Sequence, residues 1–356
     1  MRSPGALGRG NSNSQPMAEA KRSRSAPGLS ESEIIARYFA PLAEGAAESL
    51  GLEDDAALLP QRANSELVVT TDMIVEETHF RSADEPADIG YKALAVNVSD
   101  LTAKGAAPYC YLLSLVLPHA DADWLSGFSS GLGEAQVAFG CHLVGGDTTS
   151  GEGPVTISLT ALGAVPLGQM VRRAGAGAGD RLYVSGTIGD AALGLMLGRN
   201  PQLAEDWGLE ASQIAYLENR YCRPAPPIAI APLLRTHATA ALDISDGLMG
   251  DAAKLCLASG VAGEIASEQV PLSEPARKAL GADPSLFEAI MTGGDDYQVM
   301  AAIPASSAGA FEEDAAKAGV RVAAIGHLSG GEVGVGAIDG SGQKLQFSRL
   351  SFDHFT

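Results

Sequence analysis

Aromatic residues and cysteines are scarce in this sequence, and long apolar runs are absent. Only 5% of the 356 residues are aromatic although 46% are hydrophobic, which is typical of an Ala/Val/Leu-rich α/β protein. The four cysteines, Cys110, Cys141, Cys222 and Cys256, form no CxxC pair, which argues against a zinc site and fits a reducing cytosol. No apolar run reaches about 18 residues, so we expect no membrane-spanning helix and a cytoplasmic location.

Basic residues are also few relative to acidic residues. The sequence has 24 Lys and Arg against 43 Asp and Glu, which gives a formal net charge of −19. Nucleic-acid backbones are bound through Lys and Arg, so this balance argues against a nucleic-acid partner. An acidic protein can still bind phosphates if divalent metal ions lie between the charges.

The sequence suggests two domains behind a distinct N-terminal extension. Residues 1–28 are rich in Ser, Gly, Pro and Asn, carry five basic residues against one acidic residue, and lack the apolar stretch of a secretion signal. We predict that they form a disordered basic extension. The remaining chain is longer than one core usually organises, and the glycine-rich segment 172–180 is linker-like. We predict an N-terminal domain over 29–168 and a C-terminal domain over 169–356.

The pattern of apolar residues predicts an α/β fold. Ser30 and Glu33 form a capping-box sequence that opens a helix. Further helices are expected at 88–106, 121–140, 190–198, 211–221, 226–235 and 305–319. Strands are expected at 66–75, 109–118, 142–145, 155–165, 181–185, 297–304, 321–326 and 332–338, together with a strand that runs into a turn and a helix over 238–259. The alternation indicates two successive α/β units.

Aspartates recur beside these apolar segments. One example is "GGDTTSG" (145–151), which we interpret as a strand that ends in a turn. Each aspartate alone has a simple structural explanation, such as an Asx turn at Asp147 or a helix cap at Asp246. The set comprises Asp54, Asp55, Asp72, Asp100, Asp147, Asp243 and Asp246.

Taken together, the aspartates predict a cation site. Strand ends converge on one crevice in α/β sheets, and carboxylates gathered there repel one another without counter-charge. Carboxylate and hydroxyl oxygens suit Mg²⁺, which also binds substrate phosphates. No Walker A sequence is present, and the twelfth residue from Asp243 is Lys254 where a calcium loop needs Glu. His79 is a further candidate because it closely follows the Asp72 strand.

Eight motifs in order resemble the thiamine-monophosphate kinase family. Along residues 31–356 they are "IARYF", "DDAALL", "TTDMIVEETHF", "YKALAVNVSDLTAKGAAP", "LVGGDTTSG", "LDISDGL", "TGGDDYQV" and "FDHF". The resemblance implies an aminoimidazole ribonucleotide synthetase-like fold, with an N-terminal α/β domain that forms a homodimer and a C-terminal α/β domain. It implies phosphorylation of thiamine monophosphate by ATP, with several Mg²⁺ ions; a role for a monovalent cation stays open.

The resemblance also implies roles for individual residues. Transfer would be supported by Asp72, Asp147 and Arg173, without a covalent intermediate. The ATP contacts would be Gly146, Asp147, Arg173 and Ser245. The substrate contacts would be His79, Asp295 and Phe352. The metal ligands would be Asp55, Thr70, Thr71, Asp72, Asp100, Asp147, Asp243 and Asp246.

Two positions depart from the family pattern, and two other functions compete with the kinase. Glu53 stands where the family usually has Gly, and Asp295 where it usually has Glu. The alternatives are another ATP-dependent synthetase of the same superfamily and a non-catalytic metal-binding protein. A selenium-type synthetase is disfavoured because it would carry a reactive Cys near the N-terminus, and the first cysteine here is Cys110.

Overall fold

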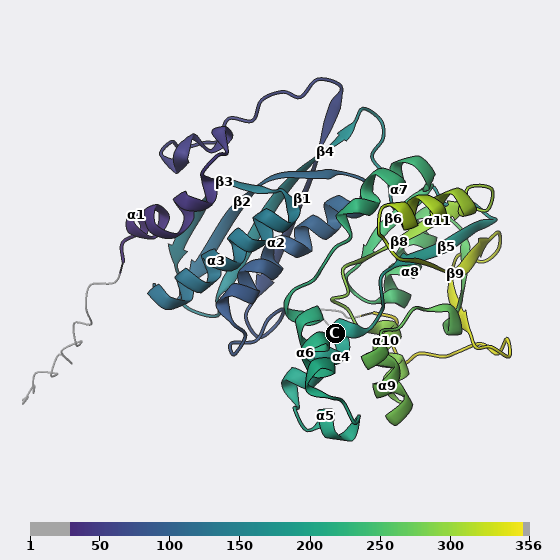
Figure 1. Ribbon diagram of the computed structural model, residues 1–356. Coiled ribbons are helices and arrows are strands. Elements are labelled where there is room, and N and C mark those ends of the chain that lie inside the picture. The colour runs from purple at the N-terminus through teal and green to yellow at the C-terminus, as the bar shows by residue number, and fades with distance from the viewer. Residues whose placement is uncertain (1–28, 352–356) are drawn as a thin grey trace, which may run out of the picture.

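Residues 29–351 are described by the computed structural model, and they form two β-sheets with helices packed on them (Figure 1). The first sheet has the strand order β1-β4-β2-β3, and the second has the order β10-β7-β9-β5-β8-β6. The predicted extension, residues 1–28, and the predicted substrate residue Phe352 lie outside the described residues.

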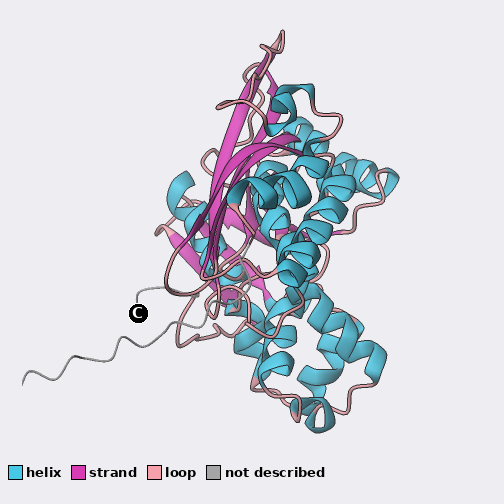
Figure 2. Cartoon of the chain, turned by 90° about the vertical axis from the view of Figure 1, so that its left-hand side faces the viewer, coloured by secondary structure: helices cyan, strands magenta, loops and turns pink. Residues whose placement is uncertain are grey.

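The N-terminal sheet is mixed and has helices on one face. Strand β4 is antiparallel to both β1 and β2, while β2 and β3 are parallel. Helices α2 and α3 pack against each other on one face, as Figure 2 shows from the side. The bounds are β1 (Ser65–Val75), α2 (Pro86–Ala103), β2 (Ala107–Leu117), α3 (Ala122–Phe139), β3 (His142–Ser150) and β4 (Thr156–Pro166).

Two glycines let α2 and α3 approach closely. A Cβ atom on Gly131 of α3 would lie 1.8 Å from the carbonyl oxygen of Ala87, and one on Gly90 of α2 would lie 2.2 Å from that of Phe128. No larger residue fits at either position without moving a backbone. This contact fixes the position of α2, which carries several site residues.

The N-terminal segment begins as predicted but does not continue as one helix. Ser30 and Glu33 form the expected capping box at α1 (Glu31–Ile34). The chain then continues as a π-helical turn, η1 (Ile35–Phe39), and two 3-10 helices, η2 (Ala40–Ala43) and η3 (Ala47–Leu52). Pro41 lacks the backbone N–H that a regular helix needs, which accounts for the break.

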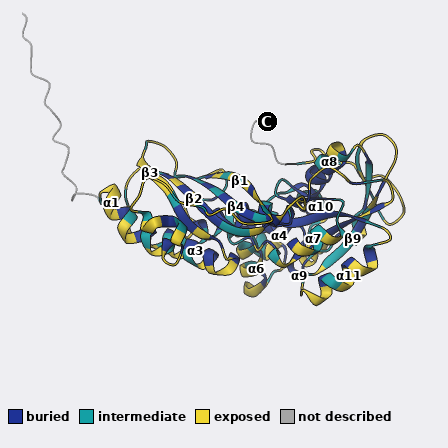
Figure 3. Cartoon of the chain, turned by 90° about the horizontal axis from the view of Figure 1, so that it is seen from above, coloured by how far each residue is buried: buried dark blue, intermediate teal, exposed yellow. Residues whose placement is uncertain are grey.

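The C-terminal sheet has a core of small and aliphatic side chains. Its strands are β5 (Asp180–Ser185), β6 (Ala240–Ile244), β7 (Ala262–Ala266), β8 (Gln298–Pro304), β9 (Val322–Ser329) and β10 (Gly334–Ile338). Every residue of β6 is buried, and so is β8 up to its last residue. In Figure 3, helices α9 and α11 carry exposed residues on the outside of the molecule.

The helical segments of this half are numerous and short. They are α4 (Asp190–Arg199), α5 (Leu203–Asp206), α6 (Ala211–Cys222), η4 (Ile228–Ile230), α7 (Ala231–His237), α8 (Leu248–Ser259), η5 (Ser267–Gln269), α9 (Glu274–Ala282), α10 (Leu286–Thr292) and α11 (Ala308–Lys317). None of the helices between residues 29 and 351 combines the length and apolar character needed to cross a membrane.

Most predicted elements are present, although the first helix is broken after Ile34 and one strand end was placed too early. The strand expected to end at residue 145 continues as β3 to Ser150, so "GGDTTS" is strand and not turn. Gly146 explains this, because a Cβ there would lie 1.9 Å from the carbonyl oxygen of Leu113 on the neighbouring strand. The glycine allows close strand approach rather than a turn. Strand β7 and helices α9 and α10 were not predicted.

Candidate active site

A cavity of about 550 Å³ lies where the two sheets meet. Its wall is built from the end of β1, from α2 and α4, and from the segments that follow β6 and α10. The sequence-predicted residues that line it are Asp72, His79, Asp100, Asp243, Ser245, Asp246 and Asp295. We call this the carboxylate cavity.

Strand alternation brings Asp72 towards the helix layer. Its backbone N–H donates to Oδ1 of Asn97 on α2 at 3.1 Å. On the same strand face, the Thr70 hydroxyl donates to Oδ2 of Asp100 at 2.5 Å. Burial, together with the nearby charges of Asp100 and Asp246, raises the pKa of Asp72 to about 6. The wall of the cavity therefore concentrates negative charge.

Asp243 adds to this crowding from the C-terminal domain. It is only 9% exposed, and it accepts a hydrogen bond from the hydroxyl of Ser99 on α2 at 2.8 Å. Burial holds its pKa well above the usual range, and the charge of Asp100 acts in the same direction. The bond between Ser99 and Asp243 also joins the two domains beside the cavity.

The turn after β6 is organised by residues that sequence reasoning missed. The alternative explanation of Asp246 as a cap of the following helix is wrong, because Gly247 occupies the cap position and makes no side-chain cap bond. Oδ2 of the buried Asp251 instead accepts from the backbone N–H groups of Ser245 and Asp246, both at 3.0 Å. Lys254 forms ion pairs with Asp246 and Asp251. The "DGLMGD" spacing, with a second aspartate one helical turn inside, was the available signal.

The remaining predicted ATP and metal residues do not line the carboxylate cavity. Asp55, Gly146 and Asp147 line a second cavity of about 720 Å³ beside β3. Thr71 cannot share a strand face with Thr70, because successive strand residues point to opposite sides. Its hydroxyl donates to the carbonyl oxygen of Leu159 at 3.0 Å.

Arg173 is exposed in the segment between the two sheets and lines neither of these cavities. Across residues 29–351, no three Asp, Glu, His or Cys side chains converge closely enough to hold a metal ion. Within a single chain, the predicted ligands therefore lie in two groups that are separated in space.

His79 and Asp295 also line the carboxylate cavity. Nδ1 of His79 accepts from the backbone N–H of Val75 at 3.1 Å, so in the neutral ring the proton resides on Nε2. The Asp295 backbone lies at φ 71°, and its N–H donates to the carbonyl oxygen of Ser245 at 2.8 Å. The Tyr297 hydroxyl donates to Oδ1 of Asp295 at 3.2 Å.

Three basic residues of this region were not predicted. Arg199 and Arg349 line the carboxylate cavity and offset part of its negative charge. Lys92 of α2 lies behind the wall and bonds to Asp295 at 3.0 Å. Lys92 had a signal in the sequence, because it is the one charged residue in the stretch "YKALAVNV".

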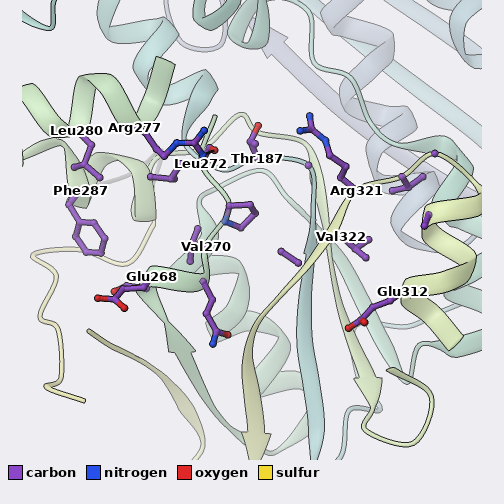
Figure 4. Close-up of a pocket in the computed structure, with 18 residues that line it drawn as sticks. Thr187, Glu268, Val270, Leu272, Arg277, Leu280, Phe287, Glu312, Arg321 and Val322 are labelled. Carbon is purple, nitrogen blue, oxygen red and sulfur yellow. Dashed lines mark hydrogen bonds between the residues drawn. The ribbon is translucent and has the colours of Figure 1, made fainter. Parts of the chain in front are cut away.

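A larger cavity lies elsewhere in the described part of the chain (Figure 4). It measures about 1050 Å³ and lies in the C-terminal domain, beside η5, α9 and α11. Figure 4 shows Arg277, Thr187 and Arg321 along one end, with Glu268 and Glu312 away from them. No sequence-predicted site residue lines it, so cavity size does not identify the reaction site.

The fold and the site define the class of protein. The model "AIR synthase related protein, N-terminal domain" matches residues 53–165, and "AIR synthase related protein, C-terminal domain" matches residues 177–338. The chain is thus a two-domain AIR synthase related protein. The thiamine-monophosphate kinase of Caulobacter vibrioides is 39% identical over 328 residues, covering 91% of this chain and 90% of the relative. The chain belongs to the thiamine-monophosphate kinase family.

Solved structures agree with this assignment. The crystal structure of thiamine-monophosphate kinase from Stenotrophomonas maltophilia K279a matches with a TM-score of 0.79 at 37% identity, covering 89% of this chain and 98% of that chain. The structure of AaThiL complexed with AMPPCP and TMP matches with a TM-score of 0.71 at 32% identity, covering 83% and 89%.

Proposed function

We propose that this enzyme moves the γ-phosphoryl group of ATP directly onto the phosphate of thiamine monophosphate. The products are ADP and thiamine diphosphate, and the reaction serves thiamine diphosphate biosynthesis. The observation that carries the proposal is the carboxylate cavity of a family member, which His79 and Asp295 line together with a group of aspartates. The related complex with AMPPCP and TMP supports both substrates.

The donor set of the carboxylate cavity fits Mg²⁺. Asp72, Asp100, Asp243 and Asp246 supply hard oxygen atoms, and the pKa values of Asp72 and Asp243 are raised by burial and by the neighbouring charge of Asp100. We propose that these residues hold Mg²⁺, together with Asp55, Thr70, Thr71 and Asp147. Bound Mg²⁺ would neutralise phosphate charge as the two anions meet.

The protein residues align the reactants and need not react themselves. The acceptor phosphate has a second pKa of about 6, so at neutral pH it is a nucleophile without a strong base. His79 and Asp295 would hold the thiamine part, and Phe352 would join them. Gly146, Arg173 and Ser245 would contact ATP. The Thr70 and Ser99 hydroxyls donate to the carboxylates of Asp100 and Asp243, and carboxylates that hold Mg²⁺ would not act as strong bases to activate them.

The exposed face of the N-terminal sheet supports a homodimer. Val68 and Ile74 are buried against α2, so the alternate residues Leu67, Val69 and Met73 lie on the other face, where each is at least 50% exposed. A contiguous apolar face of this kind marks an association surface. Asp147 lies on the same face, in register with Ser114. We propose that pairing through this face brings Asp147 of one chain to the carboxylate cavity of another.

We also propose a cytosolic location. The four cysteines are free, and three of them are buried as small apolar side chains. Free thiols of this kind persist in a reducing compartment.

The direct test is turnover. The protein with ATP, Mg²⁺ and thiamine monophosphate should form thiamine diphosphate and ADP in equal amounts, measured by chromatography, and chelation of divalent metal should abolish the product. ATP that is chiral at the γ-phosphorus should give inversion. Absence of thiamine diphosphate would refute the function, whereas net retention or a trapped phosphoprotein would refute only direct transfer.

A further inference from the structure

Lys92 is a charged residue inside the protein. Its side chain is 2% exposed, and its neighbours along α2 are buried apolar residues. Burial of an ammonium group is costly unless the charge is paired and its protons are hydrogen-bonded. The partners of Lys92 therefore indicate what it does.

Each partner of Lys92 either is one of the two residues proposed to bind the acceptor, His79 and Asp295, or contacts one of them. Nζ donates to Oδ2 of Asp295 at 3.0 Å and to the carbonyl oxygen of His79 at 3.0 Å. Nζ also lies 3.7 Å from the ring centroid of Tyr221. The Tyr221 hydroxyl donates to the same His79 carbonyl oxygen at 3.1 Å.

This arrangement ties together segments from both domains. His79 follows β1 in the N-terminal domain, whereas Asp295 and Tyr221 belong to the C-terminal domain. One ammonium group thus fixes the distance between the loop of His79 and the loop of Asp295. Asp295 is held on both oxygen atoms, by Lys92 on Oδ2 and by Tyr297 on Oδ1, so its carboxylate cannot rotate freely.

We propose that Lys92 is a positioning residue that sets the spacing between His79 and Asp295 and thereby selects the thiamine part of the acceptor. The proposal rests on the proposed function. Lys92 does not reach the reacting phosphates through these bonds; it acts through the two side chains that meet the organic part of the acceptor. Its loss should weaken acceptor binding and leave nucleotide binding in place.

The test compares Lys92→Met and Lys92→Arg with the wild type. For Lys92→Met we expect the KM for thiamine monophosphate to rise roughly tenfold or more, while the KM for ATP changes less than about twofold. Lys92→Arg keeps the charge and should show a smaller rise. The control is Lys278→Met, which removes a lysine bonded to Gln213 outside the cavity and should change neither KM.

A double-mutant cycle separates positioning from general damage. Lys92→Met should cost less acceptor affinity in an Asp295→Asn background than in the wild type, because one of its two targets is already altered. Binding of thiamine monophosphate and of AMPPCP with Mg²⁺ is measured by calorimetry on each folded variant. Equal costs in both backgrounds, or equal weakening of both ligands, would overturn the proposal.

The outcomes are distinguishable from failure of the proposed function. If the wild type does not phosphorylate thiamine monophosphate, the function is wrong whatever Lys92 does. If the wild type is active and Lys92→Met keeps its acceptor KM, the positioning role is wrong and the function stands. Should Lys92→Met not fold, Lys92→Arg decides: an unchanged acceptor KM would refute the role, and a selective rise would support it.

Discussion

At the residue scale, crowded carboxylates distinguish this cavity from an ordinary polar surface. Asp72 and Asp243 both have raised pKa values because they are buried, and because Asp100 lies close to each. A protein gains no stability from such repulsion in the absence of a cation. The cluster is therefore explained by ligand binding rather than by folding.

Replacement of one of these carboxylates should separate activity from stability. We expect Asp72→Asn to lower kcat by roughly a hundredfold or more, because charge neutralisation is the main contribution to phosphoryl transfer. The free energy of unfolding without metal should not fall, since local repulsion is relieved. Steady-state kinetics at saturating Mg²⁺ and urea denaturation measure both. Asp123→Asn, at an exposed site on α3, is the control; wild-type turnover of Asp72→Asn would contradict its assignment.

The buried carboxyl group of Asp296 makes the stability of the protein depend on pH. Asp296 is 1% exposed; its Oδ2 accepts from the backbone N–H of Gly189, while Oδ1 has no partner in the described part of the chain. Burial raises its pKa to about 8 from an ordinary value of 3.8. Between these values the folded protein keeps a proton that the unfolded chain has released. The contribution of this group to stability is therefore present at low pH and is lost as pH rises towards 8.

Asp296→Asn should remove that dependence. The amide imitates the protonated carboxyl group and does not titrate. The difference in unfolding free energy between variant and wild type, measured by urea denaturation from pH 5 to 9, should shift in favour of the variant as pH rises. A difference that is constant with pH would show that Asp296 does not carry the effect.

At the element scale, α2 is the central structural part of the site. It carries Asp100, which lines the carboxylate cavity, and it bonds to three other site residues. Asn97 bonds to Asp72, Ser99 to Asp243 and Lys92 to Asp295. Its position depends on the glycine contact with α3. The precision of the site therefore depends on helix packing outside it.

Gly131→Ala should test this dependence. The added Cβ would meet the carbonyl oxygen of Ala87 at 1.8 Å, so the two helices must separate. We expect a loss of about 1–3 kcal/mol in unfolding free energy, together with reduced turnover. Gly281→Ala on α9 is the control: its Cβ has no atom within 4 Å, and alanine favours the helix by about 1 kcal/mol. Equal effects of the two substitutions on denaturation would argue against close packing as the cause.

At the scale of the whole molecule, the two groups of predicted ligands need an explanation. Asp72 and Asp147 lie on opposite faces of one sheet, because Asp147 is in register with Ser114 and, through β4, with Met73, which alternates with Asp72. A second copy of the chain, bound to the open face of the sheet, would bring Asp147 close to the carboxylate cavity. This is why the proposed dimer and the proposed metal site depend on each other.

Val69→Glu should therefore disrupt both association and activity. Val69 is 59% exposed on the open sheet face, and two charges placed there in a symmetric pair would repel. Light scattering coupled to size-exclusion chromatography should report a monomer with reduced turnover. Val137→Glu is a matched control, since Val137 is 88% exposed on α3, away from that face. A wild-type mass for Val69→Glu would refute this interface.

The sequence by itself determined the types of most elements and the residues that could bind ligands or take part in the reaction. Strand and helix patterns follow from local periodicity, and the capping box at Ser30 and Glu33 formed as predicted because its bonds are local. The aspartate motifs likewise identified the family, to which the chain belongs.

Only the tertiary structure decided which of these residues meet. Thr70 and Thr71 were grouped by sequence but point to opposite strand faces, and Asp147 was grouped with Asp72 but lines another cavity. The role of Lys92 follows only from its contact with Asp295, a residue distant in the sequence. Burial, charge pairing and close backbone approach depend on neighbours in space, and neighbours in space are not contained in the periodicity of a single segment.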